Sequence, residues 1–194
     1  QWQRTIGGSQ DDFFNAVEMT PDSGYMLVAT TKSPVSGEKT VTNYGYNDFW
    51  IVRVDKSGNI LWQYTYGGAV GSSNITTGIC KIKNSEYILF GSSTSDIGGL
   101  KSEVCRGFID IWIVCIDSSG NYLWDKTIGG NYMDDPASCL YNPNENSIII
   151  AGMANSDASG DITLPNFGVY SDVVLFSLDA NNGNIISENR IGGN

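Results

Sequence analysis

The sequence has 194 residues, a formal net charge of −10 and no histidine. An acidic chain repels nucleic-acid phosphates and anionic membrane surfaces, and no apolar run approaches the ~20 residues of a membrane helix, so we expect neither nucleic-acid binding nor membrane insertion. The lack of histidine removes the commonest general base and transition-metal ligand, which excludes Ser-His-Asp, Cys-His and HExxH sites within the chain. Apolar residues make up 41%, enough for a hydrophobic core.

The chain is built from an internal repeat, which is the strongest pattern in the sequence. The motif IDSSGNYLWDKTIGG at 116–130 recurs at 54–68 and, in weaker form, at 178–193, and its last part stands at 2–8. We therefore expect three repeats, at about 9–68, 69–130 and 131–193, preceded by the end of another at 1–8. The period is 62 residues, as shown by two series of aspartates: Asp48, Asp110 and Asp172, and Asp55, Asp117 and Asp179.

Each repeat contains four apolar runs separated by turn formers. The first runs are 13–19, 75–81 and 136–141, and the second are 25–29, 87–91 and 148–152. The second runs are continuously apolar, which is typical of strands buried on both faces. A long polar loop follows, and the third runs are 49–54, 111–116 and 173–178. An Asp-x-x-Gly turn leads to the fourth run, at 60–66 and its equivalents.

No segment shows a sustained helical period, so we predict an all-β fold of four-stranded antiparallel blades, a β-propeller. A β-solenoid is the alternative, with repeats that are usually shorter. The small residues Ala29, Gly91 and Gly152 end the second runs, and we expect close packing between blades there. Known propellers have at least four blades, so three repeats predict a partial propeller. We expect either a fragment of a longer chain or chains that pair to complete a ring.

The repeating aspartate of the Asp-x-x-Gly turn is interpreted as a structural residue that accepts local backbone hydrogen bonds. Trp62 and Trp124 follow the turn, and we expect each to pack between neighbouring blades. The pairs Asp11-Asp12 and Asp134-Asp135 do not form a catalytic dyad alone, because adjacent residues on a strand point in opposite directions.

We predict no cofactor, no metal site and no catalytic residue. The oxygen-rich loop 155–161 leaves calcium binding as an alternative to a solvated loop, but it lacks EF-hand spacing. The four cysteines contain no CxxC pair, and buried free thiols are favoured over disulfides because three of the four lie in or near predicted strands. These cysteines are Cys80, Cys105, Cys115 and Cys139.

The long loop between the second and third runs is the part least constrained by the repeat. Aromatic residues on it would suit stacking against sugar rings, or would fold back onto their own blade. The candidate ligand-binding residues are Tyr44, Tyr46, Arg106, Phe108, Phe167 and Tyr170.

The segment FWIVRVDKSGNILWQ at 49–63, the Gly-Gly-Ser-Gln-Asp-Asp segment at 7–12 and the run 25–29 resemble the tandem propeller-like repeats of large secreted proteins of Bacteroidota. The resemblance covers the whole chain, although 69–74 replaces the Asp-Asp pair in the second repeat. It implies secretion, often through the type IX system, and an extracellular or cell-surface location. The segment 178–183 is more weakly similar to the tryptophan-docking repeat of quinoprotein propellers, from which only the architecture is taken.

Because blade periodicity accounts for nearly every notable residue, we predict a non-catalytic extracellular propeller segment that mediates protein interaction or adhesion. A carbohydrate-binding or glycan-degrading propeller that uses rim aromatics and carboxylates is the first alternative. A scaffold accessory of an outer-membrane or secretion complex is the second. The expected partners are a protein or a surface glycan, with self-association or further blades completing the ring.

Overall fold

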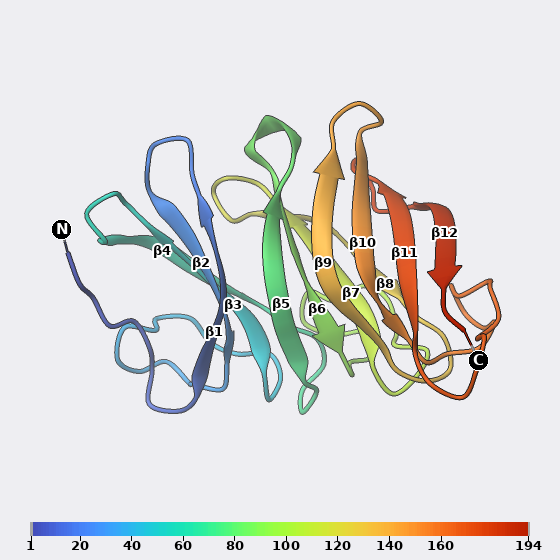
Figure 1. The fold of residues 1–194 in the computed structure, drawn as a ribbon. Helices are drawn as coiled ribbons and strands as arrows, with labels where there is room; N and C mark the ends of the chain where they lie inside the picture. The colour runs from blue at the N-terminus through green and yellow to red at the C-terminus, as the bar shows by residue number, and fades with distance from the viewer. Residues whose placement is uncertain (1, 194) are drawn as a thin grey trace.

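The computed structural model describes residues 2–193; residue 1, the first of the predicted terminal half-repeat, lies outside the described part. Residues 2–193 form three four-stranded antiparallel sheets, here called blades 1, 2 and 3, in which strand order follows chain order (Figure 1). This arrangement confirms the all-β prediction. Blade 1 contains β1 (Asp12–Met19), β2 (Tyr25–Thr31), β3 (Asp48–Val54) and β4 (Ile60–Tyr66). Blade 2 contains β5 (Asn74–Lys81), β6 (Tyr87–Ser93), β7 (Asp110–Ile116) and β8 (Tyr122–Ile128), with a short 3-10 turn at Lys83–Ser85. Blade 3 contains β9 (Asp134–Asn142), β10 (Ser147–Ala154), β11 (Asp172–Asp179) and β12 (Ile185–Ile191).

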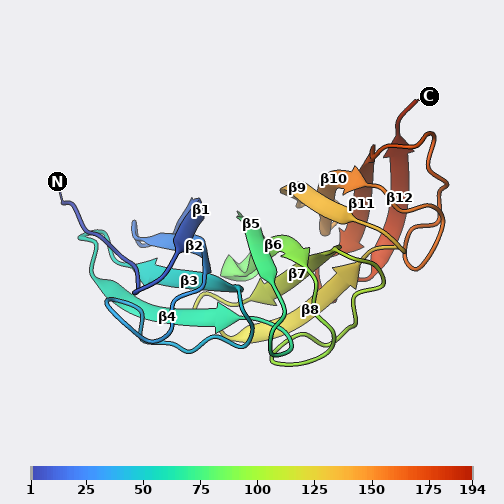
Figure 2. The ribbon, with the colours of Figure 1, turned by 90° about the horizontal axis from the view of Figure 1, so that it is seen from below.

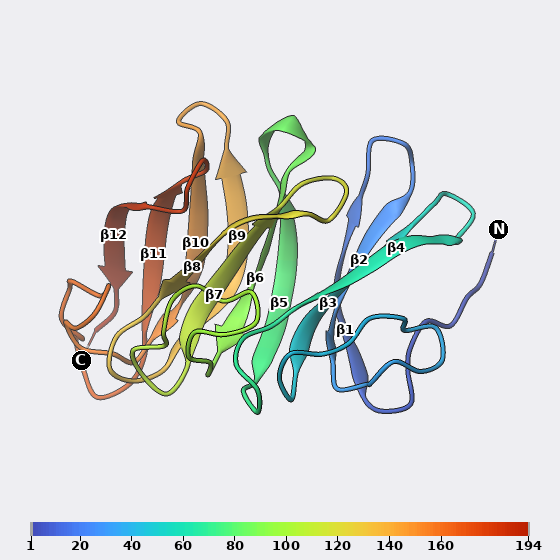
Figure 3. The same cartoon turned by 180° about the vertical axis from the view of Figure 1, so that it is seen from behind.

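The three blades fan out along an open arc (Figure 2). The first strands, β1, β5 and β9, lie next to one another on the inner side, and the fourth strands lie on the outer side. Figure 3 shows the long loops 32–47, 94–109 and 155–171 along one edge of the blades, opposite the tight hairpin turns. The arc is not closed, so these residues form a partial propeller, as predicted.

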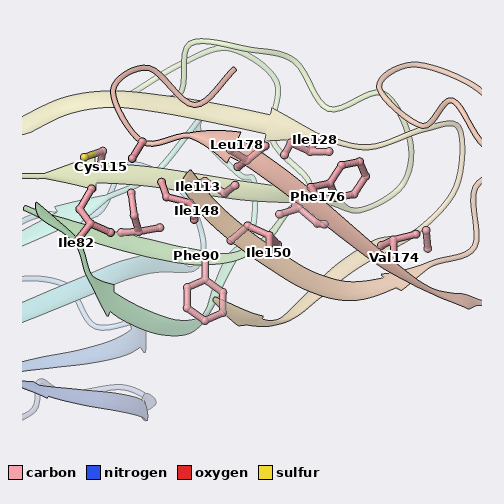
Figure 4. Close-up of a cluster of buried hydrophobic side chains, with 14 of the residues drawn as sticks. Ile82, Phe90, Ile113, Cys115, Ile128, Ile148, Ile150, Val174, Phe176 and Leu178 are labelled. Carbon is pink, nitrogen blue, oxygen red and sulfur yellow. The ribbon is translucent and has the colours of Figure 1, made fainter. Parts of the chain in front are cut away.

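The hydrophobic core lies between the blades. The cluster between blades 2 and 3 includes Phe90, Ile113, Ile150 and Phe176 (Figure 4). A second cluster lies between blades 1 and 2, where the rings of Phe49 and Trp112 are 4.9 Å apart. A third cluster, around Trp50, Val52 and Val54, lies on the other face of blade 1, where Ile6 packs against it. Each blade is therefore stabilised chiefly by its neighbours.

Burial on both faces follows the position of a blade in the arc. Every residue of β3 and β7 is buried, and in β6 only Ser92 is not. By contrast, β2 and β10 alternate between buried and more exposed positions. The prediction that all second runs are buried on both faces is thus right for β6 and wrong for β2 and β10, because blades 1 and 3 each have a neighbouring blade on one face only. On the other face of blade 1, the segment before β1 covers β3, through Ile6, but does not bury all of β2.

The glycines at the ends of the second strands of blades 2 and 3 have a different role from the predicted one. A Cβ atom on Gly91 would overlap the backbone of Ile75 and Thr76, and one on Gly152 would overlap the backbone of Asp135. These neighbours belong to the first strand of the same blade. There, each first strand carries a β-bulge, at Thr76/Gly78 in blade 2. In blades 2 and 3, the bulge inside the blade therefore requires glycine. In blade 1, Ala29 occupies the equivalent position, and its carbonyl accepts a hydrogen bond from Thr76 Oγ1 of blade 2 at 3.2 Å.

Two contacts recur at both junctions between blades and again where the segment before β1 meets blade 1. In the first, a tryptophan ring covers the turn glycine of the following blade, as predicted for Trp62 and Trp124. In the second, a Gly-Gly carbonyl accepts a hydrogen bond from the long loop of the following blade. The tryptophan contacts are Trp2 on Gly58, Trp62 on Gly120 and Trp124 on Gly183. The backbone contacts are Glu38 N to Gly7 O, Leu100 N to Gly67 O and Asp161 N to Gly129 O, each 2.9 Å.

The turn aspartates have the structural role predicted for them. In blade 1, Asp55 Oδ1 accepts hydrogen bonds from the N–H groups of Ser57 (2.8 Å) and Asn59 (2.9 Å). These bonds, with the Asn59 side-chain amide first among them, lower the pKa of Asp55. In the described part of the chain, no helix is long and apolar enough to cross a membrane.

Candidate functional site

The predicted aromatic residues of the long loops occupy equivalent places in the three blades. Each blade has an exposed aromatic residue two positions before the buried aspartate that begins its third strand. These residues are Tyr46, Phe108 and Tyr170. The N–H of Tyr46 donates to Ser72 O (2.7 Å) and that of Phe108 donates to Tyr132 O (2.9 Å), so each loop is fixed to the following blade. The exposed rings of Tyr46 and Phe108 therefore mark the two blade junctions, and Tyr170 lies at the equivalent place on blade 3, so the three rings do not meet in a single site.

The other predicted residues are used in different ways. Tyr44 lies against Gly99 of blade 2 and lines a hollow with Tyr64. The Arg106 guanidinium forms an ion pair with Asp161 at 3.1 Å, across the junction of blades 2 and 3, and donates to Thr127 O of its own blade at 3.2 Å. Phe167 is half exposed on the long loop of blade 3. Whether any of these six residues binds a ligand stays a prediction.

At the junction of blades 1 and 2, the structure brings Tyr46 together with two residues that were not predicted from the sequence, Lys32 and Phe13. Lys32 Nζ lies 5.7 Å from the centroid of the Tyr46 ring and 5.6 Å from that of Phe13. The same ammonium donates to Asp11 Oδ2 at 3.0 Å. Both rings remain more than half exposed, at 60% for Tyr46 and 53% for Phe13. A charged lysine thus sits between two accessible aromatic rings.

Two hollows flank Lys32. The first, of about 440 Å³, lies on the Tyr46 side, and the second, of about 390 Å³, lies on the Phe13 side. Amide side chains line both hollows. Among the described residues, Asn47 Oδ1 is a buried acceptor to which no donor is supplied. The lining of the first hollow includes Gln10, Pro34, Val35, Thr42 and Asn43, and that of the second includes Asn15, Thr30, Asn47 and Ile75.

Electrostatics keep this lysine charged and its surroundings close to neutral. The hydrogen bond to Asp11 raises the pKa of Lys32 above its ordinary value. Because Asp11 carries the opposite charge, the pair offers a donor-rich group with little net charge. Such a pair can donate and accept hydrogen bonds with a neutral polar ligand.

This combination occurs in blade 1 alone among the three described blades. Backbone pairing places Ile75 and Thr94 of blade 2, and Asp135 and Asn155 of blade 3, where blade 1 has Phe13 and Lys32. The sequence carried a usable signal for these residues, namely their departure from the repeat. Phe13 and Lys32 were not predicted, because the candidates were taken from the long loops, whereas Phe13 lies on a strand and Lys32 directly follows one.

The buried carboxylates along the same edge are held by the protein's own donors. Asp110 accepts from the N–H of Arg106 (2.6 Å), and Asp134 accepts from Gly130 N and Ser156 Oγ (both 2.7 Å). Burial raises the pKa of Asp110 to about 6, and the nearby Asp134 carboxylate adds to this effect. At the equivalent place between blades 1 and 2, an amide replaces the second carboxylate. These aspartates therefore fasten loops to blades.

The loop 155–161, where calcium binding was the alternative to a solvated loop, carries two carboxylates, Asp157 and Asp161. Asp161 pairs with Arg106, and Asp157 accepts hydrogen bonds from Ala158 N (2.9 Å) and Asn166 N (3.2 Å). In residues 2–193, no group of three or more cysteine, aspartate or glutamate side chains is placed to hold a metal ion. The cysteines are all free in the structure.

Comparison with known proteins gives a distant likeness of fold. No protein-family model matches the chain. No curated protein matches it either. Similar solved structures include a mutant of Synechocystis apocarotenoid oxygenase, with 14% identity and a TM-score of 0.47, covering 92% of this chain and 38% of that one. An ACO/RPE65 chimera has 12% identity and a TM-score of 0.47 over 94% of this chain and 39% of the other. A protein of unknown function from Bacteroides caccae has 11% identity and a TM-score of 0.35, over 96% and 70%.

These comparisons correct the prediction of a non-catalytic interaction or adhesion segment. Similar structures include apocarotenoid oxygenases, one of them cobalt-substituted, so proteins with a related arrangement of sheets include an enzyme. The prediction rested on blade periodicity leaving no residue for chemistry. That reasoning fails because loops on a repeated scaffold can carry residues that depart from the repeat. This chain spans less than two fifths of the oxygenase in that comparison. At such identity the likeness concerns the fold and transfers no activity.

Proposed function

We propose that this partial propeller binds a neutral saccharide at the junction of blades 1 and 2. The observation that carries the proposal is Lys32, held charged by Asp11 between the exposed rings of Phe13 and Tyr46. Aromatic faces stack on the apolar C–H face of a sugar ring, while the lysine, the carboxylate and nearby amides match its hydroxyl groups. The experiment that tests binding also measures whether the bound saccharide is cleaved.

The charge balance favours a neutral ligand over an acidic one. The chain carries a net charge of −10, and the Lys32 charge is already paired with Asp11. A polyanionic glycan would be repelled by the overall field and would gain little from a neutralised lysine. The expected ligand is therefore an oligosaccharide without carboxylate or sulfate groups.

Position along the rim supplies a matched control. Tyr46 and Tyr170 occupy equivalent places in blades 1 and 3, but blade 3 has Asn155 and Asp135 where blade 1 has Lys32 and Phe13. Replacing either tyrosine removes an exposed ring from the same kind of loop. Of the two replacements, only that of Tyr46 removes a ring from the proposed site.

The test is a glycan-array screen followed by isothermal titration calorimetry with the neutral oligosaccharides that bind. We expect Tyr46→Ala to weaken binding about ten-fold, which is about 1.4 kcal/mol, and Tyr170→Ala to leave it unchanged. Equal loss in the two variants, or binding confined to acidic glycans, would contradict the proposal. Chromatography of the incubated oligosaccharide shows in the same experiment whether the bound sugar is recovered intact or shortened.

We also propose that the parent protein acts outside the cell, in keeping with the resemblance of its repeats to those of secreted Bacteroidota proteins. A location outside the cell would bring the blade 1 site into contact with extracellular saccharides. Type IX secretion is the export route that this resemblance implies. Fractionation of the native host, with detection by antibody, tests the location. Retention of the protein in the cytoplasm would refute it.

A further inference from the structure

Two of the four thiols meet on the inner side of the arc. Cys80 lies on β5 and Cys139 lies on β9, the neighbouring first strands of blades 2 and 3 (Figure 1). Both side chains pack against the hydrophobic cluster between these blades, and each thiol affects the pKa of the other. The Cys80 thiol also lies 3.6 Å from Lys81 O, to which it donates when protonated. The other two thiols are placed differently: Cys115 is fully buried on β7, and Cys105 donates to Ser93 O at 3.0 Å in the long loop of blade 2.

The surroundings make the two thiols chemically unequal. The neighbouring Cys139 thiol, aided by the backbone N–H of Tyr141, lowers the pKa of Cys80. The same contact, together with burial, raises the pKa of Cys139. The thiolate is the attacking species in thiol exchange, so Cys80 has the character of a nucleophile and Cys139 that of the resolving thiol. Both side chains are partly exposed, which leaves a route for a small reagent.

We propose that Cys80 and Cys139 form a redox modification site, in which a low-molecular-weight disulfide such as oxidised glutathione converts the thiol pair into a disulfide between blades 2 and 3. In the first step, the Cys80 thiolate attacks one sulfur of the reagent, forms a mixed disulfide and releases one glutathione thiolate. In the second, Cys139 loses its proton to solvent and attacks Cys80 Sγ, which releases the second glutathione. The two cysteines are oxidised by two electrons, and the reagent is reduced to two thiols.

The cross-link would connect elements that no sheet joins. β5 and β9 belong to different sheets, and blades 2 and 3 are held together by side-chain packing and by the junction contacts described above. A disulfide would close a loop from residue 80 to residue 139, which limits the conformations of the unfolded chain. We therefore expect oxidation to raise the thermal midpoint of unfolding by about 10 °C.

The experiment treats the reduced protein with oxidised glutathione at pH 8 and follows free thiols, intact mass and peptide maps. The expected product has lost two of its four thiols, carries no glutathione and yields a crosslinked Cys80–Cys139 peptide. Cys105→Ser should give the same crosslink. Cys139→Ser should stop at a glutathione adduct on Cys80, and this variant keeps the reaction visible even if the wild-type intermediate is too short-lived to detect.

Three results would overturn the proposal. The first is a stable glutathione adduct on Cys80 of the wild-type protein while Cys139 remains free. The second is a disulfide that includes Cys105 or Cys115. The third is reaction of Cys105 while Cys80 stays reduced in the folded protein. None of these measurements depends on saccharide binding, so this site and the proposed function are tested separately.

Discussion

The contact between a tryptophan and the turn glycine of the next blade can be tested by adding a single methyl group. Gly120 has φ +81, and a Cβ atom there would lie 2.5 Å from a ring carbon of Tyr64 and 2.9 Å from one of Trp62. Gly71 has nearly the same backbone angle, φ +83, but no atom lies within 4 Å of its added Cβ. The two glycine-to-alanine variants therefore share the backbone strain and differ in the overlap with the preceding blade.

The expected losses follow from these two terms. Alanine in the left-handed region costs roughly 1–2 kcal/mol, and overlap in a packed contact adds roughly 1–3 kcal/mol. Gly71→Ala should therefore lose roughly 1–2 kcal/mol of unfolding free energy, and Gly120→Ala roughly 2–5 kcal/mol. Urea unfolding followed by circular dichroism measures both. If Gly120→Ala is no less stable than Gly71→Ala, the tryptophan contact does not hold the blades together as inferred.

Two further predictions concern the buried charges along the loop edge. Asp134→Asn should lower the pKa of Asp110, because it removes the neighbouring carboxylate that helps to raise it to about 6 from 3.8. Because the pKa of Asp110 is raised in the folded state, its contribution to the unfolding free energy is present at low pH and is lost as pH rises through about 6. This loss should be smaller in the variant. Carboxyl NMR titration measures the pKa, and urea unfolding between pH 4 and 7 measures the stability. An unchanged Asp110 pKa would contradict this. Lys101→Ile should cost roughly 2–4 kcal/mol, because the buried lysine donates to Glu103 O and Thr127 Oγ1. Adding Thr127→Arg should restore part of that loss in urea unfolding, and a double variant less stable than the single one would refute the argument.

The expected rescue by Thr127→Arg follows from an arrangement that blade 3 already contains. Where blades 1 and 2 have the buried Lys39 and Lys101 in the long loop, backbone pairing places Ile162 in blade 3. The cation is instead Arg190 on β12, whose Nε donates to Asp172 at 2.9 Å. Each blade thus keeps one buried cation near its buried aspartate, although the loop supplies it in two blades and a strand supplies it in the third.

Periodicity made the fold predictable because a repeat reports its own boundaries. The Gly-Gly pairs, the turn aspartates and the two tryptophans recur at the blade period, and the structure places them at turns and junctions as expected. The apolar composition of the second runs predicted burial on both faces for β2 as well as for β6, and this prediction was wrong for β2. Burial on the second face depends on a neighbouring blade, which the composition of the run does not report.

The candidate site was less predictable for a related reason. Tyr46 was a candidate because it lies on the long loop, which the repeat constrains least, whereas Phe13 and Lys32 lie on a strand and at a strand end and were not candidates. Phe13 lies on β1, Lys32 follows β2, and Tyr46 precedes β3, so only the antiparallel pairing brings them together. The meeting of Cys80 and Cys139 is harder still to predict, since it depends on how two blades pack rather than on pairing within one sheet.

The junction contacts have a consequence for dividing or recombining such a chain. Each Gly-Gly pair belongs to one sequence repeat, but its carbonyl is bound by the long loop of the next, and each tryptophan covers a turn glycine one blade further on. The cooperative packing unit is therefore shifted against the sequence repeat by one strand. A shuffled or shortened array that keeps a fourth strand together with the next three strands and the turn after them preserves both contacts. One cut directly after Gly-Gly separates partners that fold as a pair.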